Sequence, residues 1–217
     1  MSQLTLVIAN KNYSSWSLRP WLALKQAGLD FAEIRISLDT PTTHQEIRRY
    51  SPSGVLPVLQ HGNLTVWESL AICEYIAESF ASNLWPDNTA AKALARSISA
   101  EIHAGFQSLR EHMPMNCRAR LCLLGTNHRL QADINRILTI WHECRGNFSS
   151  EGDLLFGRFT IADAMFAPVV SRFITYDVKL DSVAKAYVEA IWALPAMQEW
   201  VEEANNEVEN VAQFKVW

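Results

Sequence analysis

Apolar residues follow two different periods in the first third of the chain. They run together or alternate with polar residues where strands are expected, and they recur every three or four positions where helices are expected. These periods predict strands at residues 4–9, 31–38, 58–60 and 64–67, and helices at 17–27, 44–50 and from Ser69 to about Phe80. Pro20 is expected in the first turn of its helix, where an N–H has no intrahelical partner. The order strand, helix, strand, helix, hairpin, helix predicts a mixed sheet with helices packed on it.

Every strong signal beyond residue 88 is helical. The periodicity predicts helices at residues 89–113, 129–147, 182–193 and 195–205, a buried helix that starts near Thr160, and a segment at 212–217 that folds back over the surface. Pro114 should end the first of these helices, because proline cannot continue a helix. Turn residues at 81–88 indicate a linker, in which Trp85 is expected to anchor the two domains. The sequence therefore predicts two domains, one α/β at 1–80 and one all-helical at 89–217.

Composition narrows the class of protein. Of the 217 residues, 49% are hydrophobic and 19% are charged, and the net charge is −4, which is typical of a globular protein without a basic field for nucleic acid. No apolar run approaches the roughly 20 residues of a membrane-spanning helix, and the start of the chain lacks a signal-peptide pattern. The four cysteines have no C-x-x-C spacing, which argues against zinc and against a dithiol redox site. Cys73 is expected in the core. We therefore expect a cytoplasmic protein without metal, nucleic-acid or membrane partners.

The segment 51–78 has a pattern that suits a small peptide-like ligand. Pro57 stands at the start of a strand and cannot donate a hydrogen bond, so the backbone of Leu56 is left to pair with an extended ligand. Ser69 lies where a helix cap belongs, and the free N–H groups of a helix start can hold a carboxylate. Glu68 beside it can balance an ammonium group. A ligand with peptide bonds, a carboxylate and an amino group fits these residues.

Candidate chemistry lies at residues 13–19, between the first strand and the first helix. Open α/β sheets bind ligands at this end of the strand, and the segment contains serines and no cysteine. A serine hydroxyl at a helix start can donate to a sulfur anion, and the helix dipole acts in the same direction. Lowering a thiol pKa from about 8.5 to about 6.5 requires about 2.7 kcal/mol of preferential stabilisation. One charge-assisted hydrogen bond and a helix terminus can supply that amount.

These motifs resemble the cytosolic glutathione transferases. The order V-L-P, hairpin, E-S-L-A-I-x-E-Y-I resembles the glutathione half-site of that family, and residues 14–19 resemble the S-S-x-S-x-R signature of its zeta class, the maleylacetoacetate isomerases, and of bacterial relatives. The resemblance implies a thioredoxin-like N-terminal domain followed by the all-helical glutathione-transferase domain. It also implies glutathione as co-substrate, a small electrophile as second substrate, and a two-fold homodimer.

The resemblance assigns roles to residues of this chain. It implies a glutathione site made of Ser14, Ser15, Leu56, Pro57, Glu68 and Ser69. Ser14 would activate the thiol, with Ser15 as a neighbouring contact, while Tyr13 is the rival activator. Leu56, before a cis-proline, would pair with the cysteinyl backbone, and Glu68 with Ser69 would hold the γ-glutamyl end. Trp16 stands where the zeta class usually has cysteine, which bears on isomerase activity more than on glutathione binding.

Several assignments stay open at this point. Lys11, His44, Arg48 and Arg110 are all cations that could reach the glycyl carboxylate, and none is preferred. Residues 113–116 either line the electrophile pocket or pack in the core. The motif Thr160-x-x-Asp163 resembles the family's capping box and is assigned to folding. The function is a glutathione transferase acting on a small apolar electrophile. The alternatives are a glutathione-dependent isomerase of the maleylacetoacetate type and a non-catalytic glutathione- or partner-binding module.

Overall fold

The N-terminal part of the protein is a four-stranded mixed sheet with helices on both faces. The computed structural model describes residues 3–80, 83–123, 125, 127–148 and 152–211. Its first elements are β1 (Leu4–Ala9), α1 (Ser15–Gln26), β2 (Phe31–Ile36), α2 (Thr43–Tyr50), β3 (Val58–His61), β4 (Leu64–Trp67) and α3 (Ser69–Ser79). The strand order is β2-β1-β3-β4, where β1 pairs parallel with β2 and antiparallel with β3, and β3 and β4 form a hairpin.

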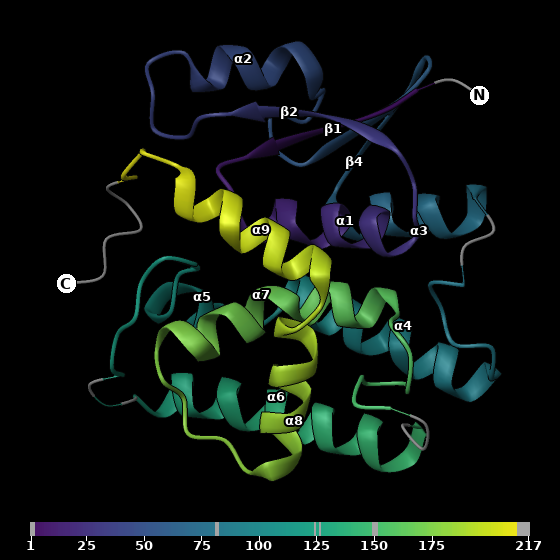
Figure 1. Ribbon diagram of the computed structural model, residues 1–217, viewed down its shortest axis with the longest axis vertical. Coiled ribbons are helices and arrows are strands. Elements are labelled where there is room, and N and C mark those ends of the chain that lie inside the picture. The colour runs from purple at the N-terminus through teal and green to yellow at the C-terminus, as the bar shows by residue number, and fades with distance from the viewer. Residues whose placement is uncertain (1–2, 81–82, 124, 126, 149–151, 212–217) are drawn as a thin grey trace.

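The two faces of the sheet have different covers. Val7 of β1 packs with Ile36, Ile47 and Val58 beneath α2. Its neighbours Leu6 and Ile8 point to the other face, as alternation along a strand requires, and join the main core beneath α1 and α3. Figure 1 shows α2 on one side of the sheet and α1 and α3 on the other, between the sheet and helices α4 to α8, with α9 beside α1. The predicted thioredoxin-like domain is confirmed.

The rest of the described chain is helical, as predicted. Its helices are α4 (Thr89–Ala104), α5 (Gln107–His112), α6 (His128–Phe148), α7 (Ile161–Thr175), α8 (Ser182–Trp192) and α9 (Pro195–Asn206). Helix α7 is almost entirely buried and packs against both α1 and α4, so one hydrophobic core runs through the two parts of the molecule. None of the helices in the described ranges has the length and apolar character needed to cross a bilayer. The segment predicted at 212–217 lies outside the described residues.

The prediction of one helix at 89–113 was wrong. The helix ends at Ala104, and Phe106 adopts a left-handed backbone conformation with φ of 60° before α5 begins. Arg110 stabilises this break, because its Nε donates to the carbonyl of Gly105 at 3.0 Å and its Nη2 to the carbonyl of Ile102 at 2.5 Å. Carbonyls at a helix end lack intrahelical donors, and a basic side chain can satisfy them.

Smaller corrections concern the ends of elements. Helix α1 begins at Ser15, so Pro20 lies beyond the first turn. Strand β2 ends at Ile36, because the N–H of Leu38 donates to the side chain of Asn10 at 2.7 Å. Ser69 is the first residue of α3 and not its cap.

The folding roles predicted for two other residues agree with the contacts. Asp163 accepts hydrogen bonds from the N–H and the hydroxyl of Thr160, both at 2.8 Å, which completes a capping box at the start of α7. Trp85 is buried, its indole N–H donates to Glu74 of α3 at 2.9 Å, and its ring centroid lies 5.2 Å from Cζ of Arg96 on α4, so the predicted linker contacts both domains.

Candidate active site between the two domains

A cavity of about 720 Å³ lies where the two parts of the chain meet. The sheet-containing part contributes residues from the β1–α1 and β2–α2 loops, α2, the loop before β3 and the start of α3. The helical part contributes residues of α5, α7 and the chain after α5. The six residues predicted to bind glutathione all line it: Ser14, Ser15, Leu56, Pro57, Glu68 and Ser69. The fold therefore brings together two segments that are separated by about forty residues in the sequence.

Ser14 occupies the N-cap position of α1. Its Oγ accepts a hydrogen bond from the N–H of Ser17 at 3.3 Å and donates to the Oγ of Ser17 at 2.7 Å. Ser17 is fully buried, and its Oγ also accepts from the N–H of Ala9 at 3.1 Å. The hydroxyl of Ser15 forms no hydrogen bond within the described part of the chain, although it lines the cavity. Two hydroxyls thus stand at the start of α1, one engaged and one open to a ligand.

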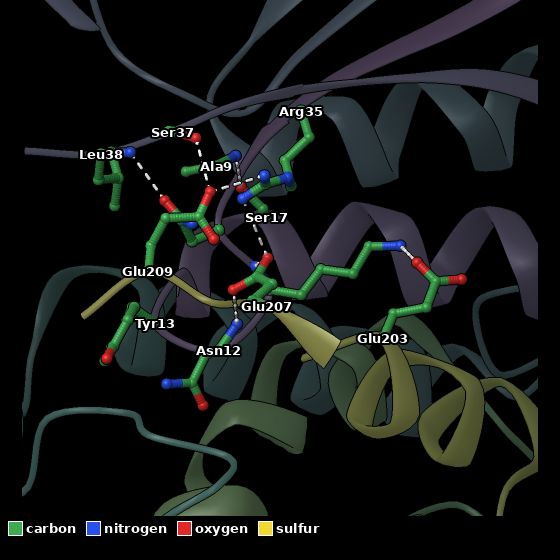
Figure 2. Close-up of polar contacts among 12 residues, drawn as sticks. Ala9, Asn12, Tyr13, Ser17, Arg35, Ser37, Leu38, Glu203, Glu207 and Glu209 are labelled. Carbon is green, nitrogen blue, oxygen red and sulfur yellow. Dashed lines mark hydrogen bonds and ion pairs between the residues drawn. The ribbon is translucent and has the colours of Figure 1, made fainter. Parts of the chain in front are cut away.

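A segment far along the chain holds the loop that precedes Ser14. Glu207, just after α9, accepts hydrogen bonds from the backbone N–H groups of Lys11 at 2.6 Å and Asn12 at 3.1 Å. Figure 2 shows this carboxylate facing the loop, with Glu209 beside Arg35 of β2 and Ser37 just after that strand. Sequence reasoning missed Glu207, because nothing near it in sequence indicates a partner 195 residues away.

Arg118 holds the same loop from the other side. Its guanidinium donates to the carbonyls of Glu207 at 2.5 Å and Glu209 at 2.8 Å, and to the hydroxyl of Tyr13 at 3.0 Å. The hydroxyl of Tyr13, the rival activator, is therefore an acceptor for a cation. Arg118 was also missed by sequence reasoning.

The half-site at residues 54–69 contains polar groups that have no partner in the described residues. The Leu56–Pro57 peptide bond is cis, and among the described residues no partner accepts from or donates to the backbone of Leu56. Ser69 is buried, and its hydroxyl has no hydrogen-bond partner in the described ranges. Glu68 adopts a φ of 70°, a strained conformation for a residue with a side chain. Buried polar groups are usually satisfied, so these groups point to a ligand.

The side chain of Glu68 keeps its negative charge available. Its Oε2 lies 3.3 Å from Nε2 of His103. Burial and the neighbouring Arg19 lower the pKa of His103, and Glu68 acts in the opposite direction without restoring it. His103 is consequently neutral at neutral pH, and the carboxylate remains free to meet an ammonium group.

Two of the four cations considered for a ligand carboxylate reach the cavity. His44 and Arg110 line it, whereas Lys11 and Arg48 do not. Lys11 is buried elsewhere, where its ammonium group forms an ion pair with Glu33 at 2.8 Å.

The helical domain lines the cavity with Arg110, Pro114, Met115 and Arg172. Of the segment 113–116, Pro114 and Met115 line the cavity, while Met113 is fully buried and belongs to the core. Arg172 was not predicted, because α7 otherwise has the apolar sequence of a buried helix. Its Nε donates to the carbonyl of Met113 at 2.8 Å, and its Nη1 donates to the carbonyl of Pro168 at 3.2 Å.

Trp16 joins the two walls. Its ring contacts two guanidinium groups, with Cζ of Arg19 at 4.4 Å and Cζ of Arg110 at 4.8 Å from a ring centroid. Such cation–π contacts strengthen when water is excluded. The residue that departs from the zeta-class pattern is thus the one that positions Arg110 beside the cavity.

Comparisons with known proteins agree with this geometry. Residues 13–79 match the N-terminal domain of glutathione S-transferases, and residues 92–203 match their C-terminal domain. A glutathione transferase homologue from Burkholderia, crystallised with bound glutathione, has a TM-score of 0.72 and 26% identity, and the alignment covers 94% of this chain and 100% of that one.

Curated relatives are more distant or match over shorter ranges. Glutathione S-transferase 1 of Dianthus caryophyllus is 28% identical over 179 residues, which are 75% of this chain and 74% of that protein. A probable maleylacetoacetate isomerase of Vibrio cholerae is 34% identical over 99 residues, 43% of this chain, and the match spans less than half (46%) of that protein's length. Both domain matches, in their expected order, show that the chain belongs to the glutathione S-transferase family.

Proposed function

We propose that this protein is a glutathione transferase that ionises the thiol of bound glutathione and presents it to a small electrophile. The observation that carries this proposal is the convergence in one cavity of an unpaired backbone at Leu56, an unpartnered hydroxyl at Ser69 and two hydroxyls at the start of α1. The bound glutathione of the Burkholderia relative supports the same co-substrate here.

Each part of glutathione has a matching group in this proposal. The cysteinyl backbone pairs with the backbone of Leu56. The γ-glutamyl carboxylate accepts hydrogen bonds from the hydroxyl of Ser69 and from free N–H groups of the first turn of α3, and its ammonium group meets Glu68. His44 of α2 is the proposed partner of the glycyl carboxylate. The sulfur then faces the start of α1.

Ser14 is the proposed thiol activator. When the sulfur binds, the hydroxyl of Ser14 turns from Ser17 toward the thiolate, and the hydroxyl of Ser17 donates to Ser14 in its place. Because the Oγ of Ser17 accepts from the N–H of Ala9, this chain of donors polarises the hydroxyl that faces the sulfur. The thiol proton leaves to solvent, and the thiolate attacks an electrophile held against Pro114 and Met115.

We further propose that the protein works in the cytoplasm as a two-fold homodimer. Leu64 and Trp67 on the edge strand β4 are 46% and 42% exposed, and apolar side chains on a sheet edge suit a partner. Sedimentation velocity should give a dimer for the wild type and a monomer for Trp67→Glu. A monomeric wild type would contradict this assembly.

Conjugation of an aryl halide such as chlorodinitrobenzene tests the transferase proposal. We expect retention on immobilised glutathione together with enzyme-dependent formation of the thioether. Retention without conjugation of any aryl halide would instead support the non-catalytic binding module, and absence of both would refute a glutathione site.

A further inference from the structure

Three arginines gather at the cavity: Arg110 and Arg172 of the helical domain line it, and Arg19 of α1 stacks on the lining residue Trp16. Arg19 and Arg172 are only 1% and 5% exposed, and Arg110 is half-buried. None of the three forms an ion pair with a carboxylate in the described residues. Buried charges in proteins are normally paired, so this cluster is electrostatically incomplete.

The arginines repel one another. Burial lowers the pKa of Arg172 to about 9, and the charge of Arg110 adds to that effect. Burial also lowers the pKa of Arg19 well below its ordinary value, with further contributions from Arg110 and Arg172. An anion placed beside them would relieve this repulsion.

Two of these guanidinium groups are open to the cavity. Nε and Nη1 of Arg172 donate hydrogen bonds to backbone carbonyls, and Nε and Nη2 of Arg110 do the same. Within the described chain, Nη2 of Arg172 and Nη1 of Arg110 have no hydrogen-bond acceptor, and neither is enclosed by protein. Both residues line the cavity, so these two donors are accessible from it.

Charge is segregated across the cavity. Its two carboxylates, Asp39 and Glu68, come from the thioredoxin-like domain, and Glu68 is assigned to the ammonium group of glutathione. Among the described residues of the helical domain, Arg110 and Arg172 line the cavity and no acidic residue does. The stack of Arg110 on Trp16 holds one guanidinium in place, and carbonyl bonds hold the other. Fixed guanidinium groups are well suited to carboxylates.

We propose that Arg110 and Arg172 bind the carboxylate of an anionic electrophile, which would make the second substrate a carboxylate-bearing molecule rather than a purely apolar one. This proposal rests on the proposed transferase function. The planar or apolar body of this electrophile packs on Trp16, Pro114 and Met115. With chloronitrobenzoate as a probe, the thiolate forms a carbon–sulfur bond at the carbon that bears chlorine, and chloride leaves with the bonding electron pair.

The test separates the second substrate from glutathione. S-methylglutathione is first bound to saturation, so that both carboxylates of glutathione already occupy their own sites. Calorimetry then compares nitrobenzoate with nitrobenzamide, which has the same shape without the charge. We expect the wild type to bind the carboxylate about tenfold more tightly than the amide, since charge-assisted hydrogen bonds are stronger than neutral ones.

Matched variants show which arginines cause the preference for the carboxylate over the amide. Arg172→Gln and Arg110→Gln should each lose most of it, and the ratio of kcat/KM for chloronitrobenzoate over chloronitrobenzamide should fall by about tenfold. Arg136→Gln removes a charge from the exposed face of α6, where Arg136 pairs with Glu101, and should keep the preference.

Equal affinity of the wild type for acid and amide would overturn the proposal, whether or not the variants fold. A loss of S-methylglutathione binding in Arg172→Gln, with the preference unchanged, would also overturn it by assigning that arginine to glutathione. If the wild type failed to bind S-methylglutathione at all, the proposed transferase function would be refuted first.

Discussion

The two walls of the cavity are built by different means. The thioredoxin-like wall presents backbone groups, hydroxyls, two carboxylates and the imidazole of His44, placed by the starts of α1 and α3, by α2 and by the loops before α2 and β3. The helical wall consists of two arginines and two apolar side chains, which are held by tertiary contacts. Backbone groups at a helix start have little freedom to vary, whereas side chains on helices can be exchanged without changing the fold. We infer that the first wall recognises a fixed co-substrate and the second selects the variable one.

The capping box of α7 gives the largest expected effect. Asp163→Ala should lower the free energy of unfolding by about 3 kcal/mol or more, because it leaves the buried N–H and hydroxyl of Thr160 without an acceptor. Urea denaturation measures the loss. Thr160→Ser keeps the hydroxyl and should cost less. Since α7 carries Arg172, a variant with full stability would show that the helical wall does not depend on this cap.

The second-largest expected effect is a loss of affinity for glutathione, without a change in how the second substrate binds. Glu68→Gln should weaken glutathione binding by about tenfold, because the ammonium group loses its charged partner. The preference for nitrobenzoate over nitrobenzamide should stay unchanged. Glu74→Gln is the matched control, because Glu74 lies on α3, which Glu68 immediately precedes, and contacts Trp85 and Arg96 away from the cavity. If Glu68→Gln changed the preference for nitrobenzoate over nitrobenzamide, the two walls would not recognise the two substrates separately.

A wall of the cavity can be predicted from the sequence when its residues lie close together along the chain, and not when they depend on contacts between distant residues. The common place of Leu56, Pro57, Glu68 and Ser69 in the cavity could be predicted, because they belong to one short stretch whose turn, hairpin and helix signals are local. The helical wall could not, because Arg172 is fixed by the carbonyl of Met113, 59 positions earlier. The break at Phe106 was missed although Gly105 stands at the C-cap of α4, because a single glycine in a helical pattern is a weak stop signal and the side chain of Arg110 completes the break.

A moderate effect on catalysis is expected from Glu207, which holds the loop behind the thioredoxin-like wall. Glu207→Gln should lower kcat/KM for conjugation by about fivefold, since a charge-assisted bond to the backbone of Lys11 or Asn12 becomes weaker and the Ser14 loop is held less firmly. Glu199→Gln is the control, because Glu199 on α9 pairs with Lys25 and does not contact the loop. Equal kcat/KM values in both variants would show that Glu207 does not position the Ser14 loop.

The smallest effect depends on pH. The hydrogen bond from Arg35 holds the pKa of Glu209 at about 2, below its ordinary value of 4.5. A lowered folded-state pKa means that the carboxylate stabilises the fold above pH 4.5 and loses this contribution as the pH falls toward 2. The difference in stability between wild type and Glu209→Gln should therefore be below about 1 kcal/mol at neutral pH and shrink in acid. A difference that grows on acidification would contradict the assignment.

Titration of the thiol of bound glutathione, followed by its ultraviolet absorbance, tests the central claim most directly. The wild type should give an apparent pKa near about 6.5, and Ser14→Ala should return it toward about 8.5, the value of a free thiol. Ser15→Ala, one residue away, should stay close to the wild type. Coincident curves for wild type and Ser14→Ala would contradict the account, and a shift confined to Ser15→Ala would transfer the activating role to that hydroxyl.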